Sequence, residues 1–589
     1  MNDQAAEYLR RLIAEQPELA RKAFYRRSEV HAGSEWLRIT SLPRRPLDLD
    51  SVPDLTPLWA QPNGKMRLWP VQSLALLEAE RSNGLFAAVP VGGGKTLLAT
   101  LLPDAMKSKR AVILVPAQSK RKKAEKDWPA LQEHWKLPLE RIALVSYTQL
   151  ERAPGDILER IEPDLVVADE AHYLKNKDAA RTARFLRYFK NRPGTRLVAM
   201  SGTFTTASLH DYAHLIKLCL RNGSPLPADY MTLAEWAEAI DVSEDPRPAG
   251  ALDRLCESRD HAHGTQNGVG VDHANNGARS RFGCRLVSTP GVIALPAGFK
   301  GVPLTLRRRE ITPPPKINAA IDRLRKTWVI GDPEAPPEAS EEITDDIAFA
   351  RFLRQLACGF YLRWDWPGGN RDHEWLEARS RWNSVVRHVL RYSRRPNLDS
   401  PMLVAGAAFR RELNQEQMAV WDEWAAVKDR RQPPTVAVWL DRYMVEHAAK
   451  WVKESSGRIV WYDSPTLGEE IAKEIGVTLP DRAVDIVMDG SPLVLSIRKF
   501  NMDVDGLQHS YTDCLYTTVP NAKEIEQSLG RIHRPGQTKP VTAEILMPID
   551  ECLDALRTTA TKARYAEETK FGEQKLLHCT LEGIELEDM

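Results

Sequence analysis

Five short apolar runs alternate with helical stretches in the first third of the chain. They are continuous rather than alternating in polarity, and they cover residues 85–89, 111–115, 142–145, 165–168 and 197–200. Continuous runs of this kind are typical of parallel strands buried on both faces by helices. The pattern returns after about residue 440, with runs at 458–462, 484–487, 493–497, 514–518 and 541–546. The sequence therefore predicts an α/β protein with two parallel sheets.

The region between the two sets of strands lacks this alternation. It contains helical segments, proline- and glycine-rich stretches and one predicted strand, 302–311, that carries three consecutive arginines. A chain of 589 residues is long enough for several domains, each with its own core. We predict an N-terminal helical extension (1–55), a first lobe (56–215), a helical and irregular insertion (216–439), a second lobe (440–550) and a C-terminal helix (551–589).

Bulk composition narrows the class of protein only slightly. The formal net charge is +1, so any surface for nucleic acid has to be a local patch. The seven cysteines are scattered and form no C-x-x-C pair, which argues against a disulfide frame or a zinc module and favours reduced thiols in a cytoplasm. No apolar run is long enough to span a membrane, and the N-terminus does not have the pattern of a signal peptide.

A glycine turn between the first strand and the next helix carries the clearest chemistry. Gly92, Gly93 and Gly94 are followed by Lys95 and Thr96. Glycines let backbone N–H groups point inward, and the helix N-terminus adds its positive dipole end, so the turn suits a phosphate group. The lysine then reaches the β/γ-phosphates of a nucleotide and the threonine hydroxyl is a ligand for Mg²⁺.

Polar residues at the ends of the later strands belong to the same edge of the predicted sheet. Asp169 and Glu170 end the fourth run, where a carboxylate suits Mg²⁺ and a second one suits a water that attacks the γ-phosphate. His172 follows, and Ser201, Gly202 and Thr203 end the fifth run, where they are candidates for relaying the nucleotide state. Upstream, Gln72 is a candidate adenine contact, because a glutamine amide pairs with the N6/N7 edge of adenine.

Two basic segments complete the set of candidates. Lys120, Arg121, Lys122 and Lys123 begin at the functional edge of the first sheet, where they suit contacts to a phosphate backbone. In the second lobe, Gln527 precedes Arg531 and Arg534, which lie three residues apart on one helical face. A guanidinium group supplied to a phosphoryl group that gains charge in the transition state accelerates transfer by ~10³–10⁵.

Together these motifs resemble the superfamily-two helicases, in particular the Swi/Snf-related branch of double-stranded DNA translocases and its shorter bacteriophage and prophage versions. The resemblance covers about residues 60–215 and 440–550. Its most branch-specific string is Gly530–Gln537, and Asp169–His172 reads as a DEAH box. The matching segments are Gln72, Gly92–Thr96, Val115-Pro116, Val145–Tyr147, Asp169–Asn176, Ser201–Thr203 and Gln527–Gln537.

The resemblance implies a fold of two RecA-like P-loop lobes and assigns roles to the candidates. Gln72 reads adenine; Lys95 and Thr96 bind phosphates and Mg²⁺; Asp169 and Glu170 hold the metal and activate water. His172 and Ser201–Thr203 couple ATP to DNA. Gln527, Arg531 and Arg534 complete the site from the second lobe.

The sequence departs from the family at two places. Val89 stands where the strict phosphate-loop pattern has glycine, and residues 496–508 contain a single glycine where the family has a glycine-rich motif.

The expected function is therefore an ATP-dependent DNA motor that uses Mg²⁺ and moves on duplex DNA. Three alternatives stay open: a helicase that separates strands in replication or repair, a DNA-binding scaffold that does not hydrolyse ATP, and an ATP-driven switch that acts on RNA. Phage or host replication and repair proteins are candidate partners. The sequence identifies no particular partner, polarity or oligomeric state.

Overall fold

A computed structural model describes most of the chain. The described residues are 28–45, 49–89, 92–152, 156–202, 204, 207–243, 245–256, 276–294, 301–331, 341–343, 345–393, 395, 398–430, 432–501, 504–569 and 572–585. About half of the predicted extension and Thr203 lie outside them. The chain divides into two compact units, the first made of Met1–Asn176, Arg184–Gly298 and Ala560–His578, and the second of Lys177–Ala183, Phe299–Thr559 and Cys579–Met589.

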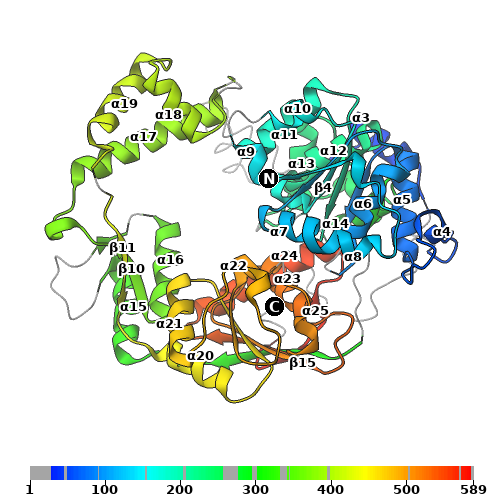
Figure 1. The fold of residues 1–589 in the computed structure, drawn as a ribbon. Helices are drawn as coiled ribbons and strands as arrows, with labels where there is room; N and C mark the ends of the chain where they lie inside the picture. Colours follow the sequence, from blue (N-terminus) through cyan, green and yellow to red (C-terminus); the bar gives the residue numbers. More distant parts are fainter. Residues whose placement is uncertain are drawn as a thin grey trace, which may run out of the picture. The chain divides into compact units, whose positions relative to one another are not determined.

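The first unit is built on a six-stranded sheet with the order β3-β2-β4-β5-β1-β6. Figure 1 labels β4 of this sheet and the helices of the same unit. Every neighbouring pair is parallel. The strands are β1 (Leu85–Ala88), β2 (Ala111–Val115), β3 (Ile142–Ser146), β4 (Leu165–Asp169), β5 (Arg196–Ser201) and β6 (Val292–Ala294). The first five are the strands that the apolar runs predict. The sixth comes from the segment that the sequence placed in the insertion.

Helices surround this sheet because successive strand residues point to opposite faces. Its helices are α3 (Ser34–Ser41), α4 (Thr56–Trp59), α5 (Pro70–Ser82), α6 (Lys95–Ala105), α7 (Ala117–Lys122), α8 (Trp128–Gln132), α9 (Tyr147–Glu151), α10 (Ile157–Ile161), α11 (Ala180–Asn191), α12 (Ala213–Leu220), α13 (Tyr230–Ile240) and α14 (Asn276–Val287). Ile113 and Val167 pack against α5 and α6. Val112 and Val166 face the opposite core, which α11 to α14 complete.

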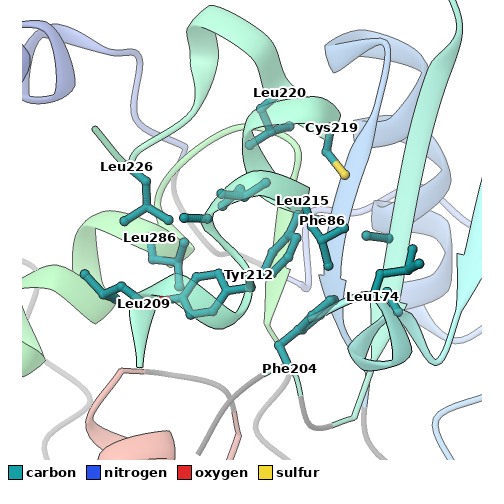
Figure 2. Packing of buried hydrophobic residues seen from close by; sticks show 14 of the residues in the cluster. Phe86, Leu174, Phe204, Leu209, Tyr212, Leu215, Cys219, Leu220, Leu226 and Leu286 are labelled. Carbon is teal, nitrogen blue, oxygen red and sulfur yellow. The ribbon is translucent and has the colours of Figure 1, made fainter. Parts of the chain in front are cut away.

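Aromatic side chains fill the second of these cores (Figure 2). The Phe86 ring of β1 stacks on Phe204, with centroids 4.0 Å apart, and lies 5.7 Å from the Tyr212 ring. Offset aromatic pairs of this kind add about 0.5–1.5 kcal/mol beyond the burial of their area. The packing fixes the position of β1, whose carboxyl end begins the glycine turn.

The second unit contains a separate six-stranded parallel sheet with the order β13-β12-β14-β15-β7-β16. Its strands are β7 (Leu304–Glu310), β12 (Arg458–Tyr462), β13 (Leu493–Ser496), β14 (Asp513–Tyr516), β15 (Val541–Met547) and β16 (Thr580–Glu582). The associated helices are α20 (Tyr443–Lys453), α21 (Pro465–Ile475), α22 (Ile497–Phe500), α23 (Ala522–Ile532) and the first half of α24 (Glu551–Glu568). The rest of α24, from Ala560 on, and α25 (Lys575–His578) belong to the first unit. Two parallel sheets covered by helices confirm the predicted fold class.

Two details of the second sheet differ from the sequence prediction. The run 484–487 is not a strand; it forms part of a 3₁₀ turn (Ala483–Asp485) and a following irregular segment, and Val484 and Val487 are exposed. Strand β7, the arginine-bearing run 302–311, pairs along its whole length with β15 rather than staying in the insertion. The acidic partner Glu544 on β15 lies 2.8 Å from Arg309, which accounts for an arginine in a sheet.

The segment between β7 and α20 forms helices and short strands that lie outside the two six-stranded sheets. It contains α15 (Pro315–Thr327), β8 (Val329–Ile330), β9 (Glu341–Glu342), α16 (Asp346–Ala357), β10 (Phe360–Trp364), α17 (His373–Tyr392), α18 (Pro401–Phe409), α19 (Gln415–Val427) and β11 (Thr435–Trp439). Strands β10 and β11 pair antiparallel, and Trp382 of α17 packs against Trp421 of α19. The predicted insertion (216–439) and its boundaries stay a prediction.

The buried carboxyl group of Asp241 at the end of α13 generates a prediction about stability. Burial raises its pKa from 3.8 to about 6, although the Ser208 hydroxyl, the Leu209 N–H and the Tyr565 hydroxyl all donate to it. Nearby Asp211 raises this pKa further. Because the folded pKa exceeds the unfolded one, this group stabilises the fold only when protonated, and its contribution is lost as the pH rises from about 4 to 6.

We expect Asp241→Asn to gain stability over the wild type as the pH rises. The difference in the free energy of unfolding, variant minus wild type, should be about 2 kcal/mol larger at pH 7.5 than at pH 4. Denaturant unfolding at several pH values measures this. Asp253→Asn, which changes an exposed acid of the same unit, is the control. A difference between wild type and Asp241→Asn that does not change with pH would show that Asp241 titrates normally.

Candidate active site

The glycine turn lies between β1 and α6, as the motif predicts. Gly92 and Gly94 have φ angles of 82° and 75°, in the left-handed region that favours glycine. A Cβ atom at Gly94 would lie 2.1 Å from Nε2 of Gln72. The turn therefore requires glycine at position 94 twice, for its backbone angle and for the close approach of the glutamine side chain.

Lys95 begins α6 and its ammonium group is held at the end of two strands. It lies 3.0 Å from Oε1 of Glu170 and donates to the Val89 carbonyl at 3.1 Å. The lysine of the glycine turn and the glutamate after β4 are thus in direct contact. The parallel sheet brings them together because β1 and β4 end at the same edge.

Glu170 has an unusual backbone for a residue with a side chain, with φ 57° and ψ 50°. Non-glycine residues held in this region cost of order 1–3 kcal/mol and cluster at functional sites. His172 Nδ1 lies 3.3 Å from Oε2 of Glu170 and 2.9 Å from the Ser201 hydroxyl. Burial alone would raise the pKa of Glu170, but the charge of Lys95 and the hydrogen bond and charge of His172 hold it well below its usual value.

A second ion pair lies beside the first. The ammonium group of Lys123 is 3.0 Å from Oδ2 of Asp169 and donates to the Thr96 hydroxyl at 2.8 Å. Burial acts to lower the pKa of Lys123, but the charge and hydrogen bond of Asp169 outweigh it, with smaller contributions from Asp127 and Glu170, and the pKa is raised. Lys123 is therefore a permanent cation in the site at neutral pH.

This position differs from the sequence prediction, which grouped Lys123 with residues that contact DNA. The α7 helix ends at Lys122, and Lys123–Asp127 form a π-helical turn. A wider turn changes the direction of the side chains relative to an α-helix, so Lys123 points inward while its neighbour Arg121 stays exposed. Sequence alone contains no strong signal for a π turn.

Thr96 and Asp169 fit the chemistry of a Mg²⁺ ion. Both present hard oxygen donors, which magnesium prefers, and the phosphates of a nucleotide supply further oxygens. Oδ1 of Asp169 is buried and accepts no hydrogen bond from any described residue. A buried carboxylate oxygen without a donor is costly unless a cation serves it.

The other candidates of the first unit, among them Gln72 and Gly202, lie near the two lysine–carboxylate ion pairs. Gln72 is buried on α5, where its Oε1 accepts from the Trp69 N–H at 2.9 Å and caps the helix, while its Nε2 lies against the glycine turn. Its amide is thus fixed next to the nucleotide motif. Gly202 follows Ser201 at the end of β5, and the third residue of that motif, Thr203, lies outside the described residues.

The rest of the basic cluster lies on or near the surface. Lys120 donates to Oε1 of Gln149 at 2.8 Å, and Arg121 pairs with Glu125 at 2.9 Å. Lys122 is half-buried. A backbone contact for these three residues stays a prediction.

The arginines of the second unit form a cluster of their own. Arg531 is buried, and its guanidinium donates to the carbonyls of Asn501 and Val504 and to Asp505. Arg534 donates to the same Asp505 oxygen at 3.0 Å. Gln527 is buried one turn earlier on α23. The unusual segment 496–508 is therefore bound to both arginines through one carboxylate.

Sequence reasoning missed three participants. The contact of Lys123 with Asp169 depends on the π turn at Lys123–Asp127, which the sequence does not signal. Asp505 gave no signal because its role depends on contacts between distant segments. The Tyr147 hydroxyl, buried after β3, donates to the Asp169 carbonyl at 2.8 Å, and only its position at a strand end could have suggested this.

Comparisons with known proteins do not settle the family. No family model matches the chain, and no curated protein matches it. The Pyrococcus furiosus Hef helicase domain is 13% identical, with a TM-score of 0.33 over 80% of this chain and 94% of that one. A Sulfolobus solfataricus SWI2/SNF2 ATPase core, solved in complex with dsDNA, is 15% identical, with a TM-score of 0.29 over 86% and 95%. Likenesses at these scores assign no activity to this chain.

Two further observations concern the chain as a whole. All seven cysteines are free thiols. Among the described residues, no helix combines the length and the apolar character that crossing a bilayer requires.

The close approach at Gly94 yields a prediction. Gly94→Ala combines left-handed strain, about 1–2 kcal/mol, with a clash against Gln72, so we expect it to lower the free energy of unfolding by at least about 2 kcal/mol. Adding Gln72→Ala removes the clash but not the strain and returns part of this loss. Gly194→Ala, where no atom lies within 4 Å of the new Cβ, is the matched control. Equal effects at positions 94 and 194 would contradict the described turn.

Proposed function

We propose that this chain is an ATP hydrolase that couples hydrolysis to movement on DNA. The observation that carries the proposal is a pair of contacts at one strand edge: Lys95 lies against Glu170, and Lys123 lies against both Thr96 and Asp169. A phosphate-binding turn, a metal-binding pair and a carboxylate for water meet at one edge of a parallel sheet, which is the arrangement that nucleotide hydrolysis requires.

Each side chain has a definite task in this proposal. Lys95 leaves Glu170 to bind the β/γ-phosphates, and Thr96 and Asp169 would hold a magnesium ion. A bound magnesium ion neutralises charge on the phosphate oxygens. Glu170 orients the attacking water and accepts its proton. The loss of the Lys95 ion pair raises the pKa of Glu170 from its low value, which improves it as a base.

The remaining candidates support the coupling. The hydrogen bond from His172 to Ser201 links the end of β4 to the end of β5, so a change at Glu170 reaches the segment that follows β5. We assign Gln527, Arg531 and Arg534 to stabilising the transferred phosphoryl group. Use of these arginines requires release of the Asp505 contact.

DNA as the partner rests on the motif resemblance, above all on Gly530–Gln537, and on the exposed part of the basic α7 helix. The same resemblance favours duplex DNA over single strands, a bacteriophage or prophage origin and work in a bacterial cytoplasm.

The test is ATP hydrolysis by the purified protein without nucleic acid and with duplex DNA, single-stranded DNA or RNA. We expect stimulation of at least tenfold by duplex DNA, and a loss of at least a hundredfold in Glu170→Gln because the base is removed. Glu125→Gln, which alters an exposed acid of the same unit, is the matched control and keeps its activity.

Each contrary result has a distinct meaning. Stimulation mainly by single strands, together with release of a labelled strand, would replace the translocase by an unwinding helicase. Stimulation by RNA alone would indicate an RNA-dependent switch. Absence of hydrolysis under every condition would contradict the proposal and leave a DNA-binding scaffold.

A further inference from the structure

We propose that Lys123 is a built-in cation that competes with the divalent metal for Thr96 and Asp169. This inference rests on the proposed function, because it concerns the metal-binding pair of the same site. The lysine then has a regulatory role. A metal ion alone binds Thr96 and Asp169 poorly, and Lys123 moves away from them only when nucleotide and metal bind together.

The geometry places the ammonium where it engages both metal-binding side chains at once. It donates to the Thr96 hydroxyl at 2.8 Å and lies 3.0 Å from Oδ2 of Asp169. The Lys123 side chain is 10% exposed and the Asp169 side chain 4% exposed. A magnesium ion binds its oxygens at about 2.0–2.1 Å. A metal ion on these ligands would share the Thr96 hydroxyl oxygen and the Asp169 carboxylate with the ammonium group, and two cations held so close together repel each other strongly.

The balance of charge in the site points the same way. Lys95 and Lys123 together neutralise Asp169 and Glu170 through the two ion pairs. A divalent ion added alone would leave two uncompensated charges in a largely buried site, which is unfavourable. A nucleotide brings negative charge together with the metal ion. The site therefore binds nucleotide and metal together, although it binds the metal ion alone poorly.

A merely structural ion pair is the competing explanation. Such a pair would account for the contact with Asp169, but it does not require the additional hydrogen bond to Thr96. Nor does it require a π-helical turn that points Lys123 away from the exposed side of the helix, where Arg121 and Lys126 lie. π turns appear frequently at functional sites.

The first test measures Mn²⁺ binding to the nucleotide-free protein by electron paramagnetic resonance. Lys123→Met removes the charge at similar length, and Lys123→Gln keeps a donor for Asp169. We expect both to bind one Mn²⁺ at least tenfold more tightly than the wild type. Adding Asp169→Asn should abolish the gain. Lys126→Met, at an exposed lysine of the same turn, should behave as the wild type.

The second test uses the wild type and does not depend on folded variants. Methylation of lysines by formaldehyde and a reducing agent, read by mass spectrometry, reports their exposure. We expect Lys123 to be protected with a non-hydrolysable ATP analogue in EDTA and at least threefold more reactive when Mg²⁺ is added. Lys126 is the internal reference.

The outcomes separate this inference from the function on which it rests. Unchanged Mn²⁺ affinity in the Lys123 variants would overturn the inference, and so would unchanged Lys123 reactivity in a wild type that binds the analogue with Mg²⁺. In both cases the proposed function stands. Failure of the wild type to bind the analogue with Mg²⁺ would contradict the proposed function and the inference with it.

Discussion

The constraint on which this site depends is the compensation of two carboxylates at the end of one buried strand. Asp169 ends β4 and Glu170 follows it in a strained left-handed conformation. Buried charges of one sign are tolerated only with partners. Lys95 from the glycine turn and Lys123 from the π turn supply these partners. Each lysine joins one of these carboxylates to a different segment, so a ligand that attracts a lysine changes the environment of its carboxylate.

The parallel sheet makes this arrangement possible. Strands β1, β4 and β5 are buried on both faces and deliver their polar ends to one edge. The aromatic packing around Phe86 holds β1, and the Tyr147 hydroxyl holds the backbone at Asp169. The same physical scheme, with separate partners, fixes Arg531 and Arg534 of the second unit on Asp505. In both units the candidate cations are held by carboxylates of the protein.

Much of the fold could be predicted because local patterns determine it. Continuous apolar runs predict the first five strands of the first sheet, and because parallel strands end at one edge, they also predict that Lys95 and Glu170 lie at the same edge. The predictions that failed share one cause: the structure there depends on tertiary contacts rather than on the local sequence pattern. The run 484–487 is apolar enough for a strand but pairs with no described strand. Strand β7 joins a sheet whose other strands lie far along the chain. The position of Lys123 depended on a π turn, and that of Asp505 on a contact between a loop and the end of α23.

The most direct test of this account is a double-mutant cycle on Lys123 and Asp169, measured by denaturant unfolding at neutral pH. Lys123→Met and Asp169→Asn should each destabilise the protein, because each leaves a buried charge without its partner. The double variant should be about as stable as the less stable of the two single variants, with a coupling free energy of about 2 kcal/mol or more. Additive effects would show that the two charges do not depend on each other, and would contradict the compensation from which the function of this site has been argued.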